Sequence, residues 1–384
     1  MMRTILEINI NLPFTYSFMP WIIYFFYLYI NKKTLSATPF LISVLFLYLG
    51  IISSIYYEND IMSLYRFLYN SLLPILILYI SLHSIEHKYL IFVKIINVIV
   101  IVNTLYGFID FVSGKTLQLV LSDLLTGSHY ENSINNDIKS NVYRLFSPFG
   151  HPLVNMGLSL IFIVSNIILV HYKDQKAYIS FKIVLLISIC NGFLINSKFG
   201  LICLALILLS LIFFTRRKIL NLIVLSIASL IAINSSFFKE NIIKRFSIAI
   251  ERGDISNGRL AALEYVFNDI LVKPFYFIGG GMGYSDELLR SVSNFNNIEI
   301  PLVMYMFDYG IVISILIIGI SYIVPAATFI KNGTYYLFFL YSIIFLFFNS
   351  FNGLAVNIGL LLILNFFAMV LMNLSNDIRR KKNA

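Results

Sequence analysis

Charged residues are scarce in this chain. Only 12% of its 384 residues are Asp, Glu, Lys or Arg, whereas soluble globular domains carry about twice that share. Hydrophobic residues make up 59% of the sequence, and the mean hydropathy is +0.85. Because so few polar side chains are available to cover a surface in water, a soluble globular fold is excluded and a polytopic membrane protein is predicted.

Cysteine and nucleotide-binding motifs are also scarce or missing. Cys190 and Cys203 lie in apolar runs and form neither a disulfide framework nor a metal-ligating spacing, so we expect two buried core thiols and no metal. The run Gly279-Gly280-Gly281-Met282-Gly283 lacks the Gly-Lys-Ser or Gly-Lys-Thr ending of a phosphate-cradling loop. An ATP-driven pump is therefore excluded, and no cofactor is predicted.

Long apolar runs make up most of the sequence. About eleven of them are long enough to cross a hydrocarbon core of roughly 30 Å. They lie near residues 12–30, 39–57, 64–82, 89–112, 152–171, 178–196, 199–215, 218–234, 298–324, 335–350 and 354–374. The predicted fold class is an all-α transmembrane bundle over residues 1–384, with a range of about 10 to 12 spans because the seventh and eighth runs are short.

The basic residues, which give a net charge of +9, indicate the orientation of the chain. They form no block that could follow a phosphate backbone, so nucleic acid is excluded as a partner. If the spans alternate, most of the Lys and Arg in short connections fall on one side, together with the run Arg379–Lys382. This side is predicted to be cytoplasmic, with the C-terminus inside and, for an odd number of spans, the N-terminus outside. We expect no cleavable signal peptide.

Two long polar loops, residues 113–147 and 234–297, then lie on the outer face. The second is far longer than a connection between helices requires. Neither the filter loop of a channel nor the paired half-repeats of a secondary carrier is visible in the sequence. The remaining alternatives are a membrane enzyme that works on the outer face and a transporter with a weak repeat.

The large outer loop places Arg259 at the start of a predicted helix. Residues 240–252 form an interfacial amphipathic pattern, and a second helix is predicted from Ser256-Asn257-Gly258 to about Leu271. Arg259 falls on the apolar face of this second helix, where its charge opposes the helix dipole. Either an anion bound at the helix N-terminus compensates this charge, or Arg259 extends to lipid headgroups.

Acidic and glycine residues follow at the far end of the same loop. Glu299 precedes Ile300-Pro301 at the start of the ninth span, where it is either a favourable helix N-terminal charge or a general base toward a hydroxyl. Asp308 lies deeper in that span, where an ionisable group is by default functional or paired. Gly279, Gly280 and Gly281 permit a tight turn, a close approach to a ligand, or simply a flexible connection.

Three further cationic or titratable residues lie at the predicted outer surface. Arg144 and His151 flank a turn set by Pro148 and Gly150, and Lys198 lies in the connection between the sixth and seventh spans. Each is by itself more typical of a topological anchor than of a ligand-binding residue. Several cations at one membrane surface nevertheless favour a binding site for an anion.

These motifs, in this order, resemble those of the O-antigen polymerase and ligase family of integral membrane glycosyltransferases. The resemblance covers roughly residues 140–320. It is carried by short motifs: Arg144, Phe149-Gly150-His151-Pro152, Ser197-Lys198-Phe199-Gly200, Ser256-Asn257-Gly258-Arg259, Lys273-Pro274, Ile278-Gly279-Gly280-Gly281, Glu299-Ile300-Pro301 and Asp308-Tyr309-Gly310. The resemblance implies a metal-independent enzyme of the bacterial cytoplasmic (inner) membrane, which acts on an undecaprenyl-diphosphate-linked oligosaccharide at the outer face.

The chain departs from the ligase pattern at two positions. Lys198 stands where ligases tend to have Arg, and Glu299 stands where they tend to have a His-Asn pair. A repeat-unit polymerase is therefore the predicted activity, with a ligase or a flippase as alternatives. Arg259, Arg144 and Lys198 would neutralise the donor diphosphate, and the general base is either Glu299 or His151. The lipid bilayer and a regulator of chain length are the further expected partners.

Overall fold

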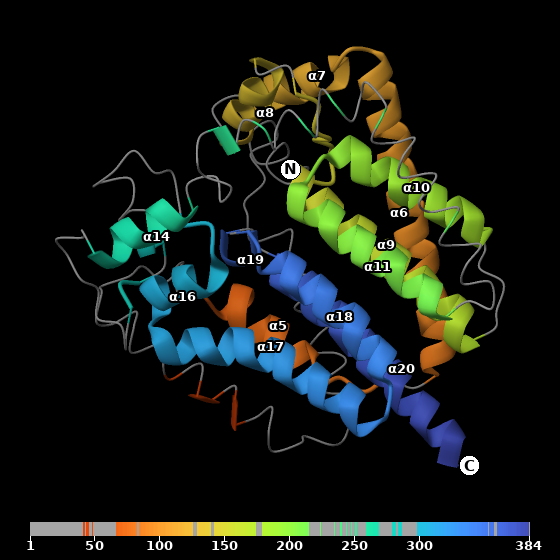
Figure 1. Cartoon of the computed structure of the whole chain (residues 1–384). Coiled ribbons are helices and arrows are strands. Elements are labelled where there is room, and N and C mark those ends of the chain that lie inside the picture. Colours follow the sequence, from red (N-terminus) through yellow and green to blue (C-terminus); the bar gives the residue numbers. More distant parts are fainter. Residues whose placement is uncertain are drawn as a thin grey trace. The chain divides into compact units, whose positions relative to one another are not determined.

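The computed structural model describes residues 67–125, 129–173, 179–214, 259–268, 279–285 and 298–383 with short gaps, and isolated positions between 41 and 48 and between 223 and 251 (Figure 1). Regular secondary structure in these described residues is entirely helical. An isolated bridge joins Ser147 and Gly150. The predicted all-α fold class is confirmed.

Four of the described helices are long and apolar enough to cross a membrane. They are α6 (Ile85–Val112), α9 (Pro152–Lys173), α17 (Ile311–Lys331) and α20 (Leu360–Asn383). Three shorter apolar helices are α10 (Phe181–Ile195), α11 (Lys198–Phe214) and α18 (Tyr335–Phe348). The chain is therefore a membrane protein. The count of eleven spans remains a prediction, because the runs near 12–30, 39–57 and 218–234 lie largely outside the described residues.

The chain divides into two compact units. Unit 1 comprises Met1–Pro20 and His87–Gly253, and unit 2 comprises Trp21–Glu86 and Asp254–Ala384. In unit 1, α9 is the most enclosed helix and packs against α10 and α11. Two further helices, α7 (Thr116–Leu124) and α8 (His129–Lys139), occupy much of the region predicted as the first outer loop. That loop is thus largely helical where it is described.

The connection between α10 and α11 is a tight turn with side-chain capping. Asn196 ends α10 in the left-handed conformation (φ 54°, ψ 48°), which Asn adopts more readily than most residues. Ser197 then accepts a hydrogen bond from the Gly200 N–H at 3.2 Å, a typical helix N-cap contact. Of the two cysteines, Cys203 on α11 is buried as expected, whereas Cys190 on α10 is exposed. An apolar run does not distinguish the lipid-facing side of a membrane helix from its buried side, because both are apolar.

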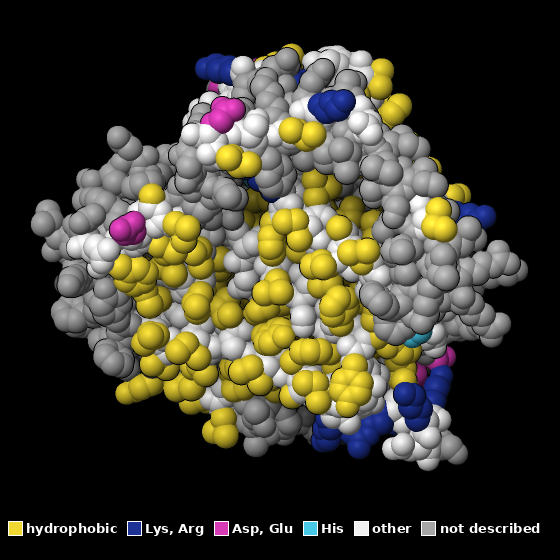
Figure 2. Space-filling view, viewed as in Figure 1, with side chains coloured by type: hydrophobic (Ala, Val, Ile, Leu, Met, Phe, Trp, Pro, Cys, Tyr) yellow, Lys and Arg dark blue, Asp and Glu magenta, His cyan; other side chains and the backbone are white. Residues whose placement is uncertain are grey.

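Unit 2 contains the remaining described helices. They are η2 (Leu68–Leu72), α5 (Leu73–Ile77), α14 (Arg259–Asn268), α16 (Pro301–Tyr309), α17, α18, α19 (Gly353–Val356) and α20. Helix α20 packs against α5, α17 and α18. Hydrophobic side chains cover α17 and α18 in Figure 2, while Lys and Arg side chains gather at the C-terminal end of α20. This distribution is typical of a bundle with a lipid-facing middle and a basic end.

The run predicted as a single span at residues 298–324 is two helices. Helix α16 ends at Tyr309 and α17 begins at Ile311, and Gly310 between them has φ 88° and ψ 164°. Only glycine adopts this conformation without a large steric penalty. Hydropathy alone could not reveal the break, since the residues on both sides are apolar.

Polar contacts within unit 2 compensate for a second irregularity. Pro325 lies inside α17 and has no backbone N–H. The Ser321 carbonyl, four residues earlier, therefore lacks the hydrogen bond that it would accept in a regular helix. The Tyr341 hydroxyl of α18 donates a hydrogen bond to that carbonyl. Asn365 of α20 donates to the Pro74 carbonyl at 3.0 Å and to the Ser321 hydroxyl at 3.1 Å. These contacts join α20, α18 and α17 through groups for which the bilayer core offers no water.

The contact between Tyr341 and Ser321 predicts a specific coupling. Tyr341→Phe should lower the free energy of unfolding by about 1 kcal/mol, because it leaves a buried carbonyl without a donor. In a Pro325→Ala background, the new N–H can bond the same carbonyl, so Tyr341→Phe should cost much less. Unfolding of the purified variants in mixed micelles measures both values. Equal costs in the two backgrounds would show that the hydroxyl does not replace the missing helical bond.

Candidate functional site

The residues predicted to form the site fall into two groups, one in each unit. Arg144, His151 and Lys198 belong to unit 1. Arg259, the run Gly279–Gly281, Glu299 and Asp308 belong to unit 2.

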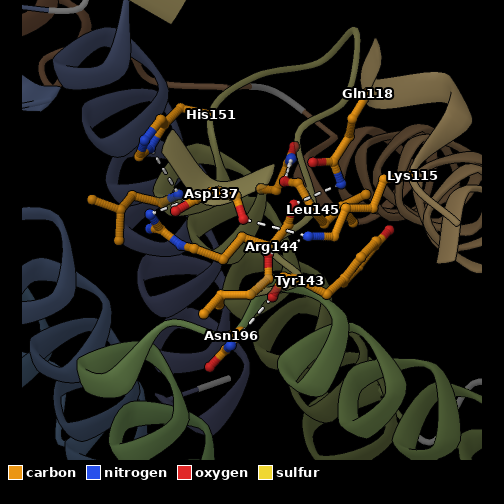
Figure 3. Close-up of polar contacts among 11 residues, drawn as sticks. Lys115, Gln118, Asp137, Tyr143, Arg144, Leu145, His151 and Asn196 are labelled. Carbon is orange, nitrogen blue, oxygen red and sulfur yellow. Dashed lines mark hydrogen bonds and ion pairs between the residues drawn. The ribbon is translucent and has the colours of Figure 1, made fainter. Parts of the chain in front are cut away.

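In unit 1, Arg144 lies in a segment without regular secondary structure, residues 142–146, which is hydrogen-bonded to two neighbouring helical elements (Figure 3). The Val142 N–H donates to the Asp137 carbonyl of α8 at 3.2 Å, and the Leu145 N–H donates to the Leu194 carbonyl of α10 at 3.0 Å. The Asn196 side-chain amide donates to the Tyr143 carbonyl at 3.2 Å. Arg144 is therefore fixed next to the start of α11, where Lys198 is the first residue.

A buried carboxylate, Asp110, holds the same segment from the end of α6. Its oxygens accept hydrogen bonds from the Gln118 backbone at 3.1 Å, the Gln118 side-chain amide at 2.7 Å and the Tyr143 hydroxyl at 3.0 Å. The Gln118 amide also donates to the Arg144 carbonyl at 2.9 Å. Sequence reasoning missed Asp110 and Gln118. An acidic residue within an apolar span was the available signal for Asp110.

Burial and the Asp110 charge set the protonation of the neighbouring groups. Burial, followed by the adjacent carboxylate, raises the pKa of Tyr143 well above its usual value, so the hydroxyl stays protonated. Burial lowers the pKa of Lys115, although the charges of Asp137 and Asp110 partly oppose this shift. The Lys115 ammonium donates to the carbonyls of Val142 at 3.0 Å and Asp137 at 3.4 Å.

The Arg144 guanidinium is mostly buried and incompletely hydrogen-bonded. One terminal nitrogen lies 3.3 Å from an Asp137 carboxylate oxygen, and the side chain is 16% exposed. Its Nε atom is buried and has no hydrogen-bond partner. A guanidinium carries five N–H donors, so this arrangement leaves donor capacity for an anion. We refer to Asp110, Lys115, Gln118, Asp137, Tyr143 and Arg144 together as the Arg144 cluster.

His151 lies at the start of α9 and caps it. Its Nδ1 atom accepts a hydrogen bond from the Leu153 N–H at 3.3 Å, and its ring packs edge-on against Phe146. A neutral imidazole that accepts at Nδ1 carries its proton on Nε2. His151 in this state can donate a hydrogen bond from Nε2, but that nitrogen cannot act as a general base.

In unit 2, the glycine run packs onto the C-terminal end of α16. The Gly280 and Gly281 N–H groups donate to the carbonyls of Phe307 at 2.6 Å and Asp308 at 2.9 Å. The Asp308 carboxylate accepts from the Ser285 N–H at 2.8 Å. The glycine run therefore approaches the backbone of α16 closely, and its role at a ligand stays a prediction. We call Gly279–Gly281, Ser285 and Asp308 together the Asp308 clasp. Within it, the Ser285 N–H is the partner of the buried carboxylate, which the sequence did not identify.

Helix α14 is described from Arg259 to Asn268, within the predicted helix, and Leu271 lies outside the described residues. The Arg259 side chain lies outside the described part, as does most of the amphipathic segment predicted at 240–252. The rings of Phe267 and Phe307, 6.1 Å apart, connect α14 to α16. Glu299 is partly buried and lies just before Pro301, the first residue of α16, as predicted.

Comparison of the chain with protein-family models, characterised proteins and solved structures found no match. Among the residues that the structure describes, no group of three or more His, Cys, Asp or Glu side chains could hold a metal ion. The chemistry of the candidate site therefore has to be argued from its own residues.

The bonding of Asp110 predicts sensitivity to an isosteric change. Asp110→Asn turns one acceptor oxygen into a donor, which will face the Gln118 or Tyr143 donors. The free energy of unfolding in micelles should fall by about 1 to 3 kcal/mol, the usual cost of an unsatisfied buried polar group. Glu264→Gln on the exposed side of α14 is the control and should change little. Similar losses of stability in both variants would show that the hydrogen bonds to Asp110 do not hold the Arg144 segment in place.

The Asp308 clasp predicts a contrast between two glycines that both have positive φ. Gly283 (φ 85°) has open space around an added Cβ, whereas a Cβ on Gly279 (φ 78°) would lie 2.5 Å from the Asp308 backbone. Gly283→Ala should therefore cost about 1 kcal/mol of stability and Gly279→Ala about 2 to 4 kcal/mol. Thermal or denaturant unfolding measures the difference. Equal losses would mean that the glycine run does not pack tightly on α16.

Proposed function

We propose that this protein is a polysaccharide repeat-unit polymerase of the bacterial cytoplasmic membrane. In this proposal it transfers a glycan from an undecaprenyl-diphosphate carrier to the non-reducing end of a lipid-linked repeat unit on the outer face. About eleven spans and two outer loops, residues 113–147 and 234–297, form the scaffold. The proposal rests on the order of the sequence motifs that resemble O-antigen polymerases and on the bonding of Arg144.

The incomplete bonding of Arg144 is the observation that carries the proposal. A cation held at a fixed backbone position, with one carboxylate partner and a buried unpaired donor, suits a ligand of higher negative charge than Asp137. A diphosphate offers several oxygen atoms that can accept paired hydrogen bonds from a planar guanidinium. Lys198, the first residue of α11, adds a second cation. In the turn before α11, Asn196 holds the Arg144 segment through its hydrogen bond to the Tyr143 carbonyl.

The proposed reaction forms one bond and breaks one bond at the anomeric carbon of the donor. The acceptor hydroxyl oxygen attacks this carbon, its proton passes to the Glu299 carboxylate, and the bond from the carbon to the diphosphate oxygen breaks. The carrier diphosphate leaves with the electron pair, and the configuration is inverted. Arg144, Lys198 and Arg259 stabilise the charge that develops on the leaving group. Of the two candidate bases, Glu299 is favoured because His151 Nδ1 already caps α9.

A transporter of lipid-linked oligosaccharide is the second candidate. The break between α16 and α17 at Gly310 favours it, because discontinuous helices form the substrate sites of many carriers. The Asp308 clasp, however, uses the α16 carbonyls at this break for contacts within the protein. A ligase is the remaining alternative, and its product distinguishes it from a polymerase.

The proposal predicts the glycans made by a deletion strain that carries variants of the chain. Arg144→Ala, Arg259→Ala and Glu299→Gln should abolish long surface polysaccharide and leave glycans with one repeat unit, whereas Arg144→Lys should retain part of the activity. Loss of one donor that stabilises a transition state costs about 100-fold to 1000-fold in rate. Lys139→Ala, which removes an exposed cation of α8, is the control and should be normal.

Each other outcome has a defined meaning. Long surface polysaccharide from normally expressed variants would refute the catalytic roles. Single lipid-linked units retained on the inner leaflet would identify a flippase. Long polymer retained on the carrier would identify a ligase.

A further inference from the structure

Helix α7 in unit 1 exposes several large apolar side chains on its outward face. Its buried face is mixed: Leu121 and Leu125 pack into a hydrophobic cluster, and the polar residues Gln118 and Ser122 are also buried. Gln118 bonds to Asp110, and the Ser122 hydroxyl bonds to Asn135 of α8 at 3.1 Å. Its outward face presents three large apolar side chains, Leu119, Val120 and Leu124, which are 48%, 51% and 40% exposed. The exposed carboxylate of Asp123 lies on the same face. A helix on the surface of a water-soluble region exposes mainly polar and charged side chains.

The turn that precedes α7 directs it away from the axis of α6. Gly114 and Lys115 both have positive φ, 70° and 71°, so the chain turns sharply after α6 ends at Val112. Figure 1 shows α7 running across the end of α6 rather than continuing it. An apolar helix that follows a membrane span and turns sideways has the geometry of a helix in the membrane interface.

The exposed face of α7 continues the lipid-facing surface of α6. The last turns of α6 expose Phe108, Ile109, Phe111 and Val112, which are followed in the chain by the turn into α7. Because α6 is a candidate membrane span, this apolar surface already faces lipid. Helix α8, which packs against α7, differs in character and exposes the polar residues Asn132, Asn136 and Lys139.

We propose that the Leu119–Val120–Leu124 face of α7 is inserted into the lipid at the membrane surface where α6 ends. The occupant of this face is the bilayer, at the depth where headgroups meet acyl chains. In the predicted orientation this is the outer leaflet. The other face of α7 holds the Arg144 cluster through Gln118, so the cluster is separated from lipid by one helix. This inference concerns the membrane contact and stands whether or not the proposed polymerase activity is correct.

Accessibility of nitroxide labels to two quenchers tests the insertion. The full chain, with Cys190→Ala and Cys203→Ala, is placed in vesicles of phosphatidylethanolamine and phosphatidylglycerol. Single labels are attached through Leu119→Cys, Val120→Cys or Leu124→Cys. Val98→Cys on the exposed middle of α6 is the lipid reference, and Asn136→Cys on α8 is the water reference. Three α7 positions ensure that one poorly folded variant does not decide the result.

Oxygen partitions into lipid, whereas a nickel chelate stays in water. The ratio of oxygen collisions to chelate collisions at the α7 labels should exceed the ratio at the Asn136 label several-fold and approach that at the Val98 label. A ratio like that of Asn136 would overturn the proposal by showing that the face is in water. Low collision rates with both quenchers would also overturn it, because a second copy or another protein would then cover the face.

Discussion

The absence of water inside a bilayer is the constraint on which the described structure depends. Every polar group removed from water there needs a partner supplied by the protein itself. Pro325 breaks the bonding of α17, and Tyr341 of the next helix supplies the donor that the broken carbonyl needs. At the end of α16, two glycine N–H groups donate to the carbonyls of Phe307 and Asp308, and the Asp308 carboxylate accepts from the Ser285 N–H. At these two described places, a side chain or a pair of glycine N–H groups completes the hydrogen bonds that the irregular backbone lacks.

Among the described residues, Arg144 is the one charged side chain with a buried atom that lacks a hydrogen-bond partner. Asp110, Gln118 and Lys115 are each bonded to the segment that carries Arg144, so the position of its backbone is determined from the end of α6 and the start of α7. Its guanidinium, in contrast, has one carboxylate partner and an unpaired Nε. Leaving a buried donor unpaired is costly, which makes a bound anion the favourable complement. A rigid support with an incompletely bonded charge is an arrangement suited to binding a ligand.

Sequence predicted the helical class, the start of α9 at Pro152, a helix over residues 259–268 and the position of Glu299 before Pro301. These features depend on hydropathy and on local capping rules, which act within one or two helical turns. It did not predict the break at Gly310, the two helices in the first loop, or the bonding of Asp110 to Tyr143, residues 33 apart in the chain. Periodicity cannot identify pairs brought together by folding, and it cannot distinguish the lipid-facing Leu119 from a buried leucine.

Binding of the carrier lipid is the most direct test of Arg144 as an anion-binding residue. The purified protein in nanodiscs can be titrated with undecaprenyl diphosphate and with undecaprenyl phosphate, for the wild type and for Arg144→Gln. We predict that the wild type binds the diphosphate lipid more tightly than the monophosphate lipid, that added salt weakens this binding, and that Arg144→Gln loses the preference. Equal affinities of the two proteins for the diphosphate lipid would contradict the assignment of Arg144 as the anion-binding residue.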